Sequence, residues 1–65
     1  MFPTADQGIS SIRVCQMLSN LMQDIHLFRF DDVTGEIYIL AGKHDDLEVV
    51  IYSDGTWEFA NEARF

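Results

Sequence analysis

The sequence predicts a single α+β domain in which one N-terminal helix packs on a four-stranded antiparallel β-meander. Three observations predict this fold. Apolar residues recur every three or four positions in the first third of the chain, as on one face of a helix. Beyond it they alternate in short segments rich in β-branched and aromatic residues, and turn segments that each contain a glycine separate these segments. A chain of 65 residues can form only one hydrophobic core, so residues 1–65 make one domain.

The helix is expected over residues 4–25. Thr4 can cap its start, and Gln7, three residues later, can complete a capping box. One broad apolar face is predicted to be buried against the sheet. Its members are Ile12, Cys15, Leu18, Met22 and Ile25, widened by Val14, Met17 and Leu21.

Strands are expected over residues 27–31, 36–41, 47–52 and 56–60. The connections between them are too short for a parallel crossover, so each strand must pair antiparallel with the next.

Alternation along these strands divides their side chains between two faces of the sheet. The face predicted to meet the helix carries Phe28, Phe30, Ile37, Ile39, Leu47, Val49 and Ile51. The opposite face carries Arg29, Tyr38, Leu40, Glu48, Val50 and Tyr52. This second face is more apolar than an ordinary solvated surface.

The last turn leaves the position of Trp57 and Phe59 open. A two-residue loop at Asp54-Gly55 would pair Tyr52 with Trp57 and place the tryptophan on the outer face. A three-residue loop with a glycine bulge would pair Ile51 with Trp57 in the core. The bulged turn is favoured because it directs Glu58 toward water.

The net charge of −7 lies entirely in the second half of the chain. Residues 1–30 contain two arginines and two aspartates, whereas residues 31–65 contain two basic and nine acidic residues. Such a surface repels the phosphates of nucleic acids and anionic lipids, so we expect no direct binding to nucleic acid or membrane. A basic protein partner is compatible with this charge.

Localisation is predicted from the apolar runs and the single cysteine. No apolar run approaches the roughly 18 residues that span a bilayer, and the N-terminus lacks the charged start and apolar stretch of a signal peptide. Cys15 cannot form an intramolecular disulfide, which fits a reducing compartment. We therefore expect a cytoplasmic protein.

Residue types that carry chemistry are present but do not form a recognisable site. Cys15 and His26 would lie about 16 Å apart along a helix, too far for a nucleophile and its base. A metal site at His26 and His44 with Asp45 or Asp46 matches no zinc spacing, and His26 is better explained as a favourable charge at the helix C-terminus. We expect no catalytic residues, no metal site and no cofactor.

Four acidic residues are expected to gather at one end of the meander, because its first and third turns share that end. They are Asp31, Asp32, Glu36 and Asp54. Their order differs from that of an EF-hand loop, so a solvated charge cluster explains them better than a calcium site.

The outer sheet face is the strongest candidate for a functional surface. Tyrosine and aliphatic side chains enclosed by charges resemble the core and rim of a protein interface. A mixed solvent face is the competing interpretation, because antiparallel sheets commonly expose scattered apolar residues. The candidate partner-binding residues are Arg29, Tyr38, Leu40, Glu48, Val50, Tyr52 and Glu58.

These features support two functional hypotheses. The first is a non-enzymatic protein-interaction module that self-associates or binds a small partner through this face. The alternative is an acidic regulator or inhibitor, antitoxin-like or DNA-mimicking, that acts on a basic target through charge.

The chain also resembles a family of short uncharacterised cyanobacterial proteins known only as a domain of unknown function. The resemblance rests on Pro3-Thr4 with Gln7 and on residues 14–20, 27–31, 37–42 and 51–59, which contain packing and turn residues and no catalytic motif. It implies a shared fold and a cyanobacterial source. Relatives of this kind are encoded beside another tiny protein, which implies a paired partner.

Overall fold

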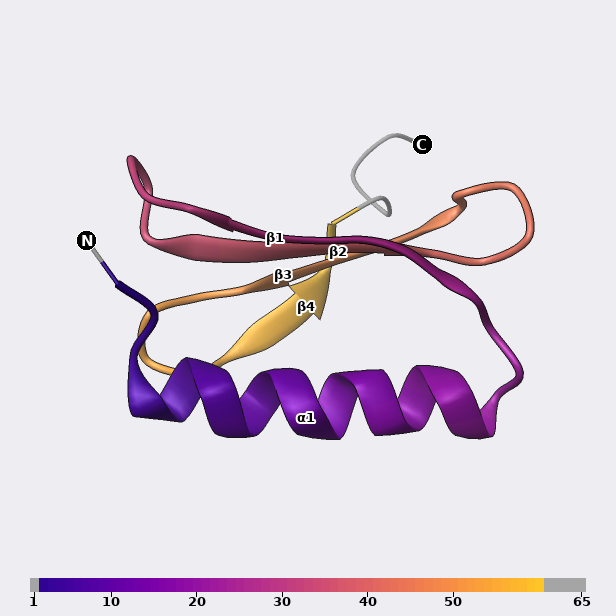
Figure 1. The fold of residues 1–65 in the computed structure, drawn as a ribbon, viewed down its shortest axis with the longest axis horizontal. Helices are drawn as coiled ribbons and strands as arrows, with labels where there is room; N and C mark the ends of the chain where they lie inside the picture. The colour runs from indigo at the N-terminus through magenta and orange to yellow at the C-terminus, as the bar shows by residue number, and fades with distance from the viewer. Residues whose placement is uncertain (1, 61–65) are drawn as a thin grey trace.

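The computed structural model describes residues 2–60. Helix α1 (Ala5–Asn20) comes first and lies along one face of a sheet, as Figure 1 shows. The four strands are β1 (Ile25–Asp31), β2 (Glu36–Ala41), β3 (Leu47–Ile51) and β4 (Trp57–Phe59). They form one antiparallel sheet in the order β1-β2-β3-β4. The predicted helix and β-meander are therefore confirmed.

The start of α1 is fixed by the predicted capping box. Thr4 is the N-cap, its hydroxyl accepts a hydrogen bond from the Gln7 amide, and the Gln7 side chain accepts one from the Thr4 amide at 2.9 Å. The Gln7 side chain is also fully buried, and its Nε2 donates to the carbonyl oxygens of Gly35 at 2.7 Å and Ile51 at 3.3 Å. One carboxamide thus links the helix start to the β1–β2 turn and to the end of β3.

The helix ends at Asn20, so the prediction that it extends to residue 25 is wrong. Met22 has a φ of 59°, and the amides of Met22 and Gln23 donate to the carbonyls of Ser19 and Leu18. This is the Schellman arrangement, in which a left-handed residue closes the last helical turn. The chain then enters β1 at Ile25, two residues earlier than predicted.

The buried face of α1 is rotated relative to the prediction. Its buried residues are Gln7, Ser11, Val14 and Leu18. Four members of the predicted stripe, Ile12, Leu21, Met22 and Ile25, are exposed. Hydrogen bonds from Thr4 to the Ser53 carbonyl and from Ser10 to the Gly55 carbonyl hold the helix beside the β3–β4 turn. These links decide which part of a broad apolar surface meets the sheet.

The core lies between α1 and the inner face of the sheet. Its members are Val14, Leu18, Ile37, Ile39, Ala41, Val49 and Ile51. Phe28 lies on the predicted inner face but is 51% exposed. The reason is that α1 packs chiefly on β3 and covers β1 incompletely. Phe28 is therefore only partly covered, contrary to the prediction that the helix would bury it.

The β3–β4 turn takes the bulged form. Ile51 pairs with Trp57, Val49 pairs with Phe59, and Gly55 has a φ of 92°. Both aromatic residues therefore lie on the inner face, where their rings meet edge to face with centroids 5.7 Å apart. Phe59 packs against the core, whereas Trp57 remains 40% exposed at the end of the sheet.

Candidate functional site

The strand register brings the predicted partner-binding residues together on the outer face of the sheet. One row crosses all four strands and consists of Arg29, Tyr38, Val50 and Glu58. A second row, one step along the strands, consists of Leu27, Leu40 and Glu48. The outer face is defined as these two rows together with Glu36 and Tyr52. Among residues 2–60, no helix or strand covers it (Figure 1).

Both tyrosines on the outer face are held by neighbouring carboxylates. The Tyr38 hydroxyl donates a hydrogen bond to Glu36 at 2.7 Å, and the Tyr52 hydroxyl donates to Glu58. The bond to Glu58 raises the pKa of Tyr52 to about 12, and the bond to Glu36 raises the pKa of Tyr38. Because each hydroxyl has a partner, the two rings have fixed orientations before any other molecule binds.

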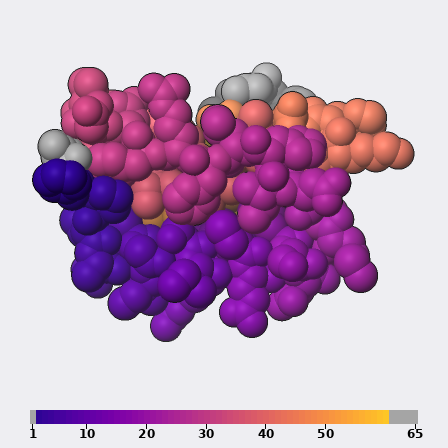
Figure 2. Space-filling view, viewed as in Figure 1, coloured from indigo at the N-terminus to yellow at the C-terminus, as the bar shows by residue number. Residues whose placement is uncertain are grey.

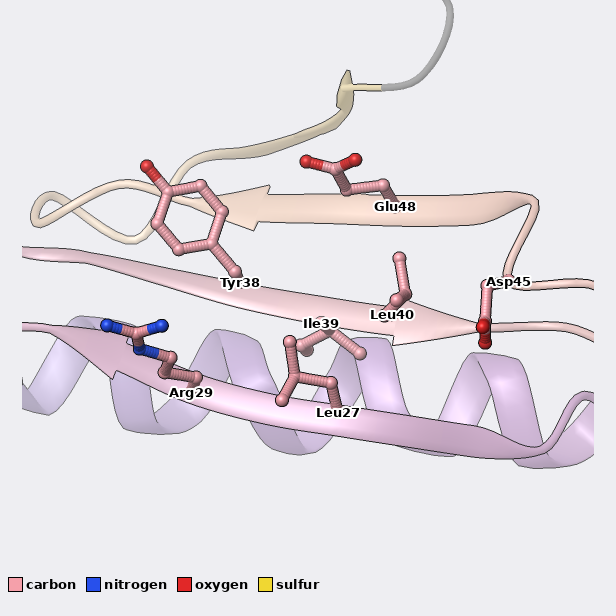
Figure 3. Close-up of a pocket in the computed structure, with 7 residues that line it drawn as sticks. All are labelled: Leu27, Arg29, Tyr38, Ile39, Leu40, Asp45 and Glu48. Carbon is pink, nitrogen blue, oxygen red and sulfur yellow. The ribbon is translucent and has the colours of Figure 1, made fainter.

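An open depression of about 440 Å³ lies on the outer face. It is lined by Leu27, Arg29, Tyr38, Ile39, Leu40, Asp45 and Glu48 (Figure 3). In this view Arg29 lies on the same strand as Leu27, Glu48 lies on β3 beyond Leu40, and the helix is behind the sheet. The depression therefore combines aliphatic side chains with a cation on β1 and an anion on β3.

Leu27 was missed as a member of the outer face. It precedes Arg29 by two residues and lies opposite Leu40, so it must share their face. The alternation along the strand is the sequence signal that indicates this position. Leu27 is 44% exposed and adds apolar surface beside Leu40.

The predicted partner-binding residues differ in accessibility. Arg29 and Glu58 are exposed, and Tyr38, Leu40, Glu48 and Tyr52 are half-buried. Val50, in contrast, is only 6% exposed beneath its neighbours on the same face. Val50 thus supports the surface from below, and the residues around it provide the accessible area.

The residues considered for metal binding are not grouped as metal ligands in the part of the chain that the structure describes. Residues 2–60 contain no group of three histidine, cysteine, aspartate or glutamate side chains placed to hold a metal ion. His26 lies in β1 and contacts Asp45, so its predicted role as a charge at the helix C-terminus is wrong. The hydrogen bond that the His26 imidazole donates to the Asp45 carboxylate raises the pKa of His26. Burial raises the pKa of the Cys15 thiol, which lowers its reactivity at neutral pH.

Two of the four acidic residues that were expected to gather at one end of the meander have local structural roles. Asp31 accepts hydrogen bonds from the amides of Val33 and Thr34, and Asp54 accepts from the amide and hydroxyl of Thr56. The bonds from Thr56 lower the pKa of Asp54. Each carboxylate thus stabilises the turn that contains it.

Comparison with protein families gives a match over residues 2–58 to a domain of unknown function, DUF6888. The chain belongs to this family. The DUF6888 match includes α1, β1, β2, β3 and every residue assigned to the outer face. Comparison with curated proteins and with solved structures gave no match. Within residues 2–60, α1 is too short and too polar to cross a membrane.

Proposed function

We propose that this protein is a non-enzymatic interaction module that binds a small protein partner through the outer face. The observation that carries the proposal is that α1 covers only the inner face, while the outer face presents two tyrosines bonded to carboxylates and an open depression lined by one of them, Tyr38. An aliphatic and aromatic centre within a charged rim is the usual composition of a protein interface. Rings that are already oriented lose little conformational entropy when a partner binds.

The charges of the outer face favour a partner with basic residues at its rim. Glu36, Glu48 and Glu58 lie on this face, whereas Arg29 is the only basic residue among its members. Complementary charge at an interface rim accelerates association and aligns the partners more than it adds affinity. We assign the protein to the cytoplasm, because its one cysteine, Cys15, has no other cysteine in the chain to pair with.

Site-specific photo-crosslinking tests the proposal. The photoreactive residue p-benzoylphenylalanine replaces Tyr38 on the outer face in one variant and Trp57 on the inner face in a matched aromatic control. Both variants are expressed in the cells that naturally encode the protein. We expect a discrete crosslinked protein band from position 38 and none from position 57. The proposal is rejected if position 38 gives no band, or if both positions give the same band.

The acidic-regulator hypothesis is separated from this proposal by its dependence on charge. Binding through charge alone weakens steeply as ionic strength rises above the physiological range. Binding through the outer face depends on Leu40 and the tyrosines and therefore persists in 0.5 M salt with a slower association rate. A partner that is released by salt, and that binds equally well to a Tyr38→Ala variant, would favour the regulator.

A further inference from the structure

β1 is the longer of the two edge strands of the sheet. The sheet order places β1 and β4 at the two edges, and β1 has seven residues whereas β4 has three. A long edge strand presents unpaired main-chain groups that another strand can use, whereas a short edge offers few. In Figure 2, β1 lies on the side turned to the viewer, directly above the helix. Among residues 2–60, no strand pairs with this edge.

The main-chain groups that face the open edge can be identified. The Asp31 carbonyl accepts a hydrogen bond from Gly35 at 2.8 Å, which directs it toward β2. Main-chain groups alternate in direction along an antiparallel strand, so those of Leu27 and Arg29 also face β2. Those of Phe28 and Phe30 therefore face the open edge.

The exposed side chain of Phe28 also favours pairing of another strand at the same edge. Its ring lies on the inner face and is 51% exposed. On α1, Ile12 is also 69% exposed. A strand added to β1 would thus gain main-chain hydrogen bonds and also cover apolar surface that α1 leaves open.

The distribution of charge along the chain indicates which kind of molecule can pair with this edge. β1 contains Arg29 and Asp31, whose charges cancel, whereas residues 32–65 contain eight acidic and two basic residues. Two copies of the chain repel each other through their acidic halves, so contact between copies costs least at β1. A basic partner would gain most from the acidic half of the chain. The edge therefore fits a second copy best.

We propose that two copies of this chain pair antiparallel through β1 and form one continuous eight-stranded sheet. The ladder of β1 is irregular between Ile25 and Leu27, so its regular part is Leu27–Asp31. Pairing these five residues with their counterparts places Arg29 on the two-fold axis. The outward-facing Phe28 of each copy then pairs with Phe30 of the other.

This register has two further consequences. Phe28 and Phe30 form two aromatic cross-strand pairs on the inner face, a favourable kind of pair. On the outer face, the two Arg29 side chains repel each other across the axis, but each lies diagonal to Asp31 of the other copy, within reach of an ion pair. The two Arg29 residues form a non-hydrogen-bonded pair with Cα atoms about 4.5 Å apart. That separation suits a disulfide.

Sedimentation equilibrium tests the dimer. We expect twice the chain mass for the unmodified protein and the mass of a single chain for Phe28→Pro, because proline removes an outward N–H without disturbing the β1–β2 ladder. Phe28→Lys gives the same result if the proline variant fails to fold. Tyr38→Ala, on the outer face, remains dimeric. A monomeric unmodified protein, or a dimeric Phe28→Lys variant, overturns the proposal.

Disulfide trapping tests the register. In a Cys15→Ala background, Arg29→Cys forms a covalent dimer under mild oxidation, whereas Leu27→Cys, on the same face of the same strand, does not. Equal trapping at both positions, or trapping at position 27 alone, contradicts the register. These experiments measure the mass of the chain and its covalent dimer without any partner protein. Their outcome therefore does not depend on partner binding through the outer face.

Discussion

The buried carboxamide of Gln7 provides a sharp test of how the fold is held together. Its Nε2 donates to the carbonyls of Gly35 and Ile51, while its Oε1 accepts from Thr4. The substitution Gln7→Glu keeps the shape of the side chain and the acceptor for Thr4. An ionised carboxylate cannot donate, however, so it would leave both carbonyls without their donor and place a negative charge against them.

The size of the effect follows from the desolvation of these groups. Each buried acceptor that loses its donor costs about 1–3 kcal/mol. The contact at 3.3 Å is the weaker of the two, so we expect Gln7→Glu to lower the free energy of unfolding by about 2–5 kcal/mol at pH 7.5. A domain of this length is stabilised by only about 3–10 kcal/mol, so the loss is easily measured.

The loss depends on pH with a defined sign. Burial and the facing carbonyls raise the pKa of the introduced carboxyl above its ordinary value of about 4.3. The folded state then holds a proton that the unfolded state has released, so stability falls as pH rises above that ordinary value. At pH 4.5 the protonated carboxyl can donate one hydrogen bond to Gly35, and roughly half of the lost stability returns.

Urea unfolding at pH 4.5 and 7.5, followed by circular dichroism, measures this difference. The pH dependence of the unmodified protein is subtracted. Gln7→Ala is the control, since it removes all three hydrogen bonds and introduces no titrating group. If Gln7→Glu loses the same stability at both pH values, the carboxamide is not the donor to Gly35 and the account of this link is wrong.

Three further predictions concern particular backbone and ionic features. Met22→Gly should raise the free energy of unfolding by about 0.5–1 kcal/mol, because the Met22 side chain is 90% exposed and its backbone is in the left-handed conformation that favours glycine. Thermal unfolding measures the gain. Gly8→Ala should raise the free energy of unfolding by up to about 1 kcal/mol, since an added Cβ meets nothing within 4 Å. Gly55→Ala should lower it, because Gly55 has a positive φ and close neighbours, and urea unfolding compares the two variants. Because the pKa of His26 is raised in the folded state, its contact with Asp45 stabilises the fold below pH 6.5, and this stabilisation is lost as pH rises through the folded-state pKa. Asp45→Asn should therefore lower the midpoint of the His26 imidazole titration measured by NMR.

The order and type of the elements could be predicted because periodicity and turn chemistry act locally. The switch from helical spacing to alternation separated α1 from the strands, and the short connections required an antiparallel meander. The sequence left two forms of the turn before Trp57 open, and the bulged form, which was favoured because it exposes Glu58, is the one observed. Each of these inferences depended on residues close together in the chain.

The end and the rotation of α1 could not be predicted because both depend on tertiary contacts. Met22 occupies a position that usually holds glycine, so the sequence carries no stop signal there. Apolar residues such as Ile9 and Ile12 lie on sides of the helix that are not buried, and the hydrogen bonds to Ser53 and Gly55 select the face. The periodicity alone permits several rotations.

The candidate site was predicted in outline by alternation. The pattern placed Tyr38, Leu40 and Tyr52 on one face, and the register confirms Tyr38 and Leu40 there. It did not reveal that Glu36 and Glu58 hold the tyrosine hydroxyls, or that Val50 is covered by its neighbours. Those features depend on side-chain conformations, which the period of a strand does not determine.

Partner binding through the outer face is tested most directly by calorimetry. The partner identified by photo-crosslinking at position 38 is titrated against two matched variants of this protein. Leu40→Lys places a charge beside the depression, whereas Val33→Lys places the same charge at an exposed apolar position in the β1–β2 turn. We predict that Leu40→Lys weakens binding by at least about tenfold, as a charge in an interface core would, and that Val33→Lys leaves the affinity unchanged. Equal affinity for the two variants would contradict the assignment of the outer face as the binding surface.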